Sequence, residues 1–384
     1  MATSRFETIC DRLRFSLDEP CVEQARGQRG IADFVARIRS SGLRVTATTL
    51  PNIHQTVCRV QQTLELGELP EVYVVNDPHA NAAAPAFGRH SRPFVVLNSG
   101  LVNLLSSVEL EFTLGHELGH LGMNHVFREG SAEPRTEFEA LRARSRERYA
   151  EISADRIGLI AGRSVYSAAH VMVKLACGLT GSSVALDIDA FWDQLNRRPD
   201  EVNRDWELHE SHPALPLRLW AVIRFAETSE YAQLSESMSS ATNLTEIDRE
   251  IERRFSELGD GRLTKMEDRV LQRSLTWLGL VLIAADALIE PHEQAALIDL
   301  VGEEDAEKAI GFFKEHGQDA VEQKLTETIG RIRDSNAATR RRFIEAVRSF
   351  CLALGLRLET SPAWVPLSTT LGPNFFLVGN QNEQ

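Results

Sequence analysis

The chain has 384 residues and a formal net charge of −13, with 55 acidic against 42 basic side chains. This length favours two or three domains, and the negative charge opposes binding to the phosphates of nucleic acids. The five cysteines are scattered without a CxxC pair, which is typical of reduced thiols. The N-terminus lacks the apolar core of a signal peptide, and no apolar run reaches the roughly 20 residues that span a bilayer. We therefore predict a cytoplasmic protein with no nucleic-acid partner and no transmembrane segment.

The first third of the chain predicts helices followed by a small sheet. Apolar residues at helical spacing over 1–65 predict an N-terminal helical segment. Two short β-type runs follow, at 72–75 and 94–97. The next helix is expected to begin after Ser106, because Ser106-Ser-Val-Glu109 has the form of a capping box, and to end near position 126.

The rest of the chain is mostly helical in pattern. A second capping-box pattern at Thr136 opens a helix that we expect to end at Ala161, with Gly162 as its C-cap. Further helices are predicted at 164–178 and 215–227. The fold class is therefore α+β and mostly helical. We divide the chain into an N-terminal helical segment, a domain with the small sheet, an all-α domain and an extended tail: 1–65, 66–245, 246–360 and 361–384.

The helix after Ser106 carries the sequence His116-Glu117-Leu-Gly-His120, which is an HExxH motif. Residues four apart share a helix face, so both imidazoles can converge on one metal ion. Glu117 lies about 100° around the helix from His116, where it can act as a general base for a metal-activated water. The alternative is a chance match on a helix surface. A leucine stripe that anchors the opposite side of the helix disfavours it.

Gly115, Gly119 and Gly122 form a further face of the same helix. Each glycine costs about 1 kcal/mol relative to alanine inside a helix. Three on one face therefore predict a neighbour whose backbone approaches closely.

A zinc hydrolase needs a third protein ligand and one open position. His125 is near in sequence, but its spacing from His120 departs from the metzincin pattern, so we interpret it as structural. The preferred candidate is Glu151 in Glu151-Ile-Ser-Ala-Asp155, with Asp155 placed to accept a hydrogen bond from His116. The alternative is an exposed carboxylate pair on an arginine-rich helix. Apolar positions further along that helix indicate burial and favour the ligand interpretation.

His212 lies in a Ser-His-Pro sequence ahead of a new helix. A histidine held near the metal there can donate a hydrogen bond to the oxyanion of a tetrahedral intermediate. The alternative is a histidine that only opens the helix, and the sequence alone leaves both interpretations open.

The order HELGH, ExxxD and Ser-His-Pro followed by arginine resembles the gluzincin metallopeptidases of the HtpX and CAAX-prenyl-protease type. The upstream sequence around Asn81-Ala-Ala-Ala is also similar to theirs, and the resemblance covers about 65–230. It implies a zincin-type catalytic domain with one Zn²⁺ per chain. The implied site consists of the zinc ligands His116, His120 and Glu151, the general base Glu117, the ligand partner Asp155, the transition-state donor His212, and Arg218 and Asn81 in substrate-binding or structural roles.

The sequence departs from this family in two places. Many members carry transmembrane helices, and this chain is predicted to have none. The family's usual Asn-Ala-Phe-Ala is replaced by Asn81-Ala-Ala-Ala-Pro85. In gluzincins an edge strand of this kind pairs with an extended peptide, and Pro85 removes one backbone donor.

In the C-terminal third, 266–358 resembles TerB-like tellurite-resistance helical domains through the stretch 282–293. That resemblance implies that Asp286, Glu290 and Glu293 bind a cation weakly. The alternative is an ordinary helix-turn-helix with an acidic surface loop.

Taken together, these patterns predict a zinc metalloendopeptidase that hydrolyses extended polypeptides through a Glu-activated, zinc-bound water. The alternative is a catalytically weak peptidase-fold scaffold or stress-response binding protein that acts through its C-terminal helical domain. We further expect a regulatory partner to act through 246–384.

Overall fold

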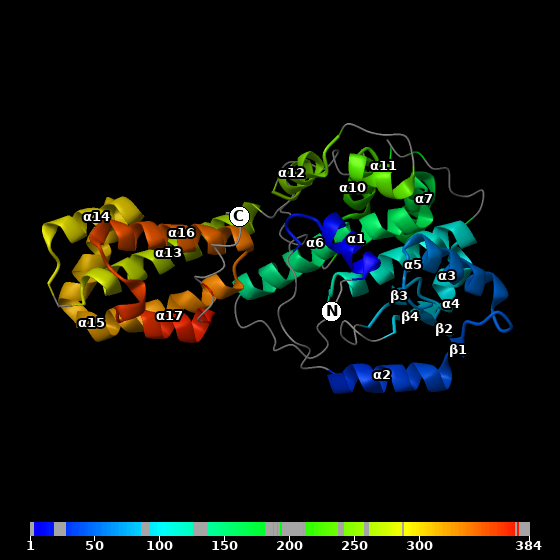
Figure 1. The fold of residues 1–384 in the computed structure, drawn as a ribbon, viewed down its shortest axis with the longest axis horizontal. Helices are drawn as coiled ribbons and strands as arrows, with labels where there is room; N and C mark the ends of the chain where they lie inside the picture. Colours follow the sequence, from blue (N-terminus) through cyan, green and yellow to red (C-terminus); the bar gives the residue numbers. More distant parts are fainter. Residues whose placement is uncertain are drawn as a thin grey trace. The chain divides into compact units, whose positions relative to one another are not determined.

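The computed structural model has many helices and a small four-stranded sheet (Figure 1), which confirms the predicted α+β class. The chain divides into two compact units, 1–259 and 260–384. Within the described parts of the chain, no helix is both long and apolar enough to cross a bilayer. The structure describes residues 4–18, 28–85, 92–125, 137–180, 187, 190, 193, 210, 212–236, 242–256, 261–285, 288–372 and 375, with the backbone alone at 28–30, 261–262 and 337.

The sheet lies in the first unit and has the strand order β1-β2-β4-β3. β2 and β4 pair in parallel and are the two predicted strands, while β1 and β3 pair antiparallel to them at the edges. β1 was not predicted, because two residues are too few to show an alternating pattern. The strands are β1 (Leu43–Arg44), β2 (Glu71–Val75), β3 (Ala82–Ala83) and β4 (Phe94–Asn98).

Both faces of the sheet are covered. Successive side chains of a strand point to opposite faces, so Val72 and Leu97 lie in the main core of the unit. Tyr73 and Val96 lie in a separate cluster with residues of α2 (Gln28–Ser41). The helix α2 therefore covers one face of the sheet, away from the helices that build the main core (Figure 1).

The helices α5 (Ser107–Gly122) and α6 (Glu137–Gly162) pack closely along the glycine face of α5. A Cβ added at Gly115 or Gly119 would come within 2.4 or 3.0 Å of an atom of α6. A Cβ at Gly122 would come within 2.5 Å of an atom in α1 (Arg5–Leu13). This confirms the predicted close neighbour, which is α6 over most of the face.

The ends of these helices agree only in part with the sequence patterns. The capping box at Ser106 is present. The predicted C-cap at Gly162 is wrong, since this residue is still helical and the positive φ, 51°, belongs to Arg163. A Cβ at Gly162 would lie 3.3 Å from Phe112, so its small size serves helix packing instead. Thr136, in the second predicted capping box, lies outside the described residues.

The first unit extends further than the predicted boundary at 245. Helix α12 (Leu244–Phe255) packs into it, because Ile247 and Ile251 share a buried cluster with Phe15 and Leu217. The amphipathic pattern of α12 gives no information on which core the helix joins. The other helices of this unit are α3 (Pro51–Thr63), α4 (Ser99–Leu104), α7 (Val165–Cys177), α10 (Leu215–Ala226) and α11 (Ser229–Ser235).

In the described part of the second unit, the regular elements are all helices. Helix α13 packs against α14, α15 and α16, and α17 packs against α15. The predicted extended tail at 361–384 is wrong over 364–371, which forms α17. Pro366 falls in the first turn of α17, where a missing N–H removes no helical hydrogen bond. The elements are α13 (Gly261–Ile283), α14 (Pro291–Val301), α15 (Glu303–Asp334), α16 (Ala337–Leu354), η3 (Leu358–Thr360) and α17 (Trp364–Leu371).

Candidate metal centre

Helix α5 holds both histidines of the HExxH motif in the interior. His116 and His120 are buried, and their Nε2 atoms lie 3.0 Å apart. The helix is fixed at its start by the capping box at Ser106 and along its glycine face by α6. The two imidazoles are therefore held by a rigid backbone at the spacing that a single ion requires.

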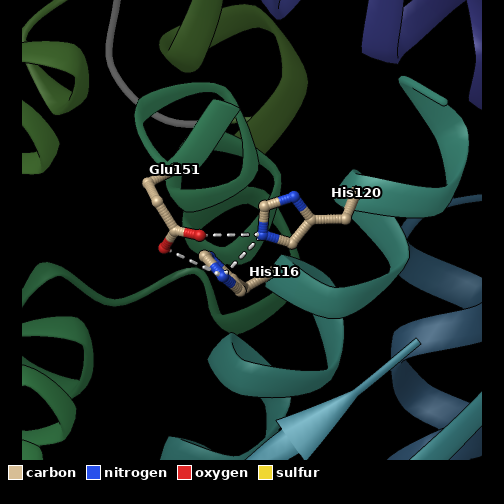
Figure 2. A group of neighbouring side chains, drawn as sticks. All are labelled: His116, His120 and Glu151. Atoms are coloured by element: carbon tan, nitrogen blue, oxygen red, sulfur yellow. Dashed lines mark hydrogen bonds and ion pairs between the residues drawn. The ribbon is translucent and has the colours of Figure 1, made fainter. Parts of the chain in front are cut away.

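Helix α6 brings Glu151 to the same point. Its carboxylate lies 3.5 Å from His116 Nε2 and 3.3 Å from His120 Nε2. Figure 2 shows the three side chains pointing toward one another, the imidazoles from α5 and the carboxylate from α6. One ligand atom of each lies within 4.8 Å of the others, and no second group of this kind occurs in the described part of the chain.

Arg218 of α10 ties the acidic side chains of α6 together. Its Nε and Nη2 donate to Asp155 at 2.8 and 2.7 Å. Its Nη1 lies 2.9 Å from Glu151 Oε2, as an ion pair without hydrogen-bond geometry. The sequence left the role of Arg218 open between substrate and structure, and the structure places it as a buried counter-charge to the two carboxylates.

Asp155 also forms a hydrogen bond with His116, one of the candidate metal ligands. Its Oδ1 accepts a hydrogen bond from His116 Nδ1 at 2.9 Å. A proton on Nδ1 leaves Nε2 of His116 to face Glu151, which is the tautomer that a metal ligand needs.

These contacts favour the ionised forms of Glu151 and Asp155. Burial raises the pKa of Glu151, but Arg218 and the two imidazoles lower it more, so this pKa lies well below its ordinary value. Burial likewise raises the pKa of Asp155, and the Arg218 charge and hydrogen bonds bring it below its ordinary value. For His116, burial lowers the pKa, while the charges of Glu151 and Asp155 raise it to a net value above the ordinary one.

Glu117 is buried and lines the cleft beside the three residues. Its Oε2 accepts no hydrogen bond from any described residue, and the same holds for Glu151 Oε2. Buried carboxylate oxygens without a partner are costly. Glu151 Oε2 is ion-paired with Arg218, whereas Glu117 Oε2 has no hydrogen-bond partner among the described residues. A cation with a bound water would satisfy Glu117 Oε2, so the donor set and this oxygen fit a metal ion.

His212 reaches the cluster from the segment before α10. Its side chain is 58% exposed, and its Nε2 lies 3.5 Å from Glu151 Oε1. Arg148 of α6 donates to the Glu210 carbonyl at 3.0 Å and so holds the chain near His212. The N-cap of α10 is Ala214, which disfavours a role for His212 in opening that helix. Ser211 of the same motif lies outside the described residues.

His125 lies beside His120, a contact that the sequence pattern did not indicate. It does not join the three candidate ligands, but its Nδ1 lies 2.8 Å from His120 Nδ1. Its Nε2 donates to Asp18 Oδ2 at 2.9 Å. Burial lowers the pKa of His125 by more than Asp18 raises it. No sequence signal pointed to Asp18, because it lies 107 positions from His125 along the chain.

The candidate centre lies in a cleft of about 760 Å³. The segment around β3 lines it, including Asn81 and Pro85, and Ile31 and Phe34 of α2 form part of its apolar wall. The backbone oxygen of Asn81 accepts from the Asn98 amide at 3.0 Å, which fixes this segment beside β4. The cleft is therefore bounded by an edge strand of the sheet and by apolar side chains.

Two of the three acidic residues predicted to bind a cation in the second unit cap a helix. Glu293 accepts a hydrogen bond from the Glu290 amide at 2.8 Å, and the two form the capping box of α14. Asp286 lies outside the described residues. Helix capping accounts for two of the three predicted cation ligands, and the TerB-like resemblance stays a prediction.

Part of the chain is similar to a known protein family. Residues 47–141 match the model of peptidase family M48. The matched segment contains His116, Glu117 and His120 and ends before Glu151 and Arg218.

Several curated relatives agree with the M48 match. The plastoglobule-localized metallopeptidase 48 of Arabidopsis thaliana is 27% identical over 226 residues, which cover 53% of this chain and 65% of that protein. A protease HtpX homolog of Tropheryma whipplei is 34% identical over 88 residues, or 23% of this chain and 29% of that protein. A protease HtpX homolog of Thermodesulfovibrio yellowstonii is 36% identical over 78 residues, which cover 20% of this chain and 27% of that protein. These matches span less than two thirds of the length of each relative.

Proposed function

We propose that the protein is a zinc-dependent endopeptidase that cleaves extended polypeptides. The observation that carries the proposal is the meeting of His116, His120 and Glu151 within 4.8 Å, next to the buried Glu117. Two imidazoles and one carboxylate are a donor set found in zinc hydrolases, and they leave a coordination position for water or substrate.

Each residue around this set has a role in the proposed reaction. When bound, zinc lowers the pKa of a coordinated water to about 7 and polarises a carbonyl group. The Glu117 carboxylate accepts the proton of the attacking water at its unpaired Oε2 and passes it to the leaving amine. His212 donates a hydrogen bond to the oxygen that becomes negative during attack. Arg218 and Asp155 hold Glu151 and His116 in place.

The shape of the cleft favours an extended peptide as substrate. β3 is the last strand of the sheet, so its outer edge offers backbone groups to a further strand. β3 also lines the cleft, beside the apolar side chains of Ile31 and Phe34. An unfolded segment bound along β3 would present its backbone to the metal and its alternate side chains to this wall. Pro85 limits the length of that pairing.

The decisive experiment measures metal and activity in the same preparations. We expect about one zinc per chain, cleavage of unfolded casein, and loss of cleavage on chelation with recovery on adding zinc. Glu117→Gln should retain zinc and lose about 10²–10⁴-fold in rate, because only the base is removed. Glu111→Gln is the matched control on the same helix, since Glu111 pairs with Arg59 instead. Activity of Glu117→Gln equal to that of the control would refute the mechanism.

A further inference from the structure

His120 has a partner on its second ring nitrogen. Its Nδ1 lies 2.8 Å from His125 Nδ1, and His125 Nε2 lies 2.9 Å from Asp18 Oδ2. The side chains of His125 and Asp18 are only 9% and 3% exposed. The chain of contacts thus runs from the candidate ligand to a buried carboxylate, as the direct contact of His116 with Asp155 does.

One arrangement of protons satisfies all of these contacts. A histidine that binds a metal through Nε2 carries its proton on Nδ1 and donates it. His125 must then accept from His120 at Nδ1, so its own proton lies on Nε2 and is donated to Asp18. The His125 ring therefore transmits the orientation set by Asp18 to the ring of His120.

Asp18 is itself held rigidly. Its Oδ2 accepts a hydrogen bond from Ser153 Oγ of α6 at 2.6 Å and one from Arg14 at 3.4 Å. The Phe15 amide donates to the same Ser153 Oγ at 2.9 Å, and the Phe15 ring is buried against Tyr149. The segment after α1 is thus anchored to α6 by both polar and apolar contacts.

We propose that Asp18 and His125 are positioning residues for the metal centre, which fix the ring orientation and the tautomer of His120. The inference rests on the proposed role of His120 as a zinc ligand. It extends the site to the N-terminal segment, because Asp18 lies outside the stretch 47–141 that matches the M48 model.

The test measures the zinc dissociation constant of the full chain by competition with a chromophoric chelator. His125→Phe should weaken zinc binding by about 10–100-fold, because His120 loses the side chain that accepts the hydrogen bond of its Nδ1 and orients its ring. His125→Gln should restore most of the affinity, since its amide oxygen can accept from His120 and its amide nitrogen can donate to Asp18. The visible spectrum of the cobalt-substituted protein should change in His125→Phe and return toward wild type in His125→Gln.

Phe15→Leu is the matched control for simple loosening of the N-terminal segment. It should lower the melting temperature of the metal-free protein and leave the zinc dissociation constant unchanged, because it removes packing and no polar partner. Equal zinc affinity in His125→Phe and wild type would overturn the positioning role and leave the proposed function intact. A loss of zinc affinity in Phe15→Leu as large as that in His125→Phe would also overturn the positioning role. A wild-type protein without zinc affinity would overturn both.

Discussion

His212 is the exposed member of the cluster, and its contribution can be separated from metal binding. Because its proposed role is a hydrogen bond to the developing oxyanion, His212→Phe should lower kcat by about 10²–10³ and leave KM and zinc content nearly unchanged. Steady-state kinetics on a fluorogenic peptide measures both constants. His292→Phe is the matched control, since His292 is exposed in the second unit. A change confined to KM would make His212 a substrate-binding residue.

Glu151 should be essential for the metal itself. Glu151→Gln keeps the size of the side chain but removes the charge that pairs with Arg218 and faces both histidines. We expect zinc content to fall from about one per chain to a small fraction after dialysis. Glu147→Gln, one turn earlier on α6 and 39% exposed, should retain the full content by the same metal analysis. Equal zinc in both variants would move the third ligand elsewhere.

At the scale of residues, the sequence anticipated contacts that follow from helix geometry. The spacing of His116 and His120, and of Glu151 and Asp155, is local, so each pair could be placed on one helix face before the structure. The contact between His125 and Asp18 could not be predicted in this way, because the packing of separate elements brings the two residues together. Local periodicity carries no information about such a contact.

At the scale of elements, the close packing of α5 on α6 is what brings Glu151 to the histidines. A Cβ at Gly119 already comes within 3.0 Å of Ile157, so Gly119→Leu would push the helices apart. We expect a loss of stability of about 1–3 kcal/mol from overpacking, together with loss of zinc, although no ligand is changed. Gly311→Leu is the control, because no atom lies within 4 Å of a Cβ at that helical position. Thermal melting and zinc analysis of the two variants should differ clearly, and similar melting temperatures would show that α5 and α6 can separate without cost.

Sequence patterns also predict some helices and strands better than others. The strands β2 and β4 were found because five residues of β-prone sequence show a pattern, whereas β1 has two residues and shows none. Prolines suggested an extended tail, yet α17 forms, since Pro366 lies where a helix tolerates proline. Short-range patterns therefore predicted the long elements and missed those whose state depends on tertiary packing.

At the scale of the whole molecule, the first unit should fold and stay active when the second unit is removed. A chain ending at Gly259 keeps α12, whose Ile247 and Ile251 are fully buried in the first unit. We expect this chain to fold, to hold zinc and to cleave a generic peptide at least as fast as the full-length protein, if the second unit regulates access or recruits substrate. A chain ending at Thr245 loses the packing of α12 and should aggregate or melt at a markedly lower temperature.

Circular dichroism, zinc analysis and peptide cleavage on the three lengths check this prediction. A peptide rate that falls strongly in a folded, zinc-loaded chain ending at Gly259 would contradict a purely regulatory second unit. Unfolding of that chain would instead show that the first unit depends on the second for stability.

The buried charge of Arg218 also bears on the charge of the ion that would suit the proposed metal site. Glu117, Glu151 and Asp155 contribute three negative charges, Arg218 contributes one positive charge, and imidazoles are neutral when they bind a metal. Two negative charges remain, which a divalent cation neutralises. A monovalent ion would leave one buried charge uncompensated, and a trivalent ion would add one. By this charge balance, Arg218 would favour a divalent ion in the proposed site.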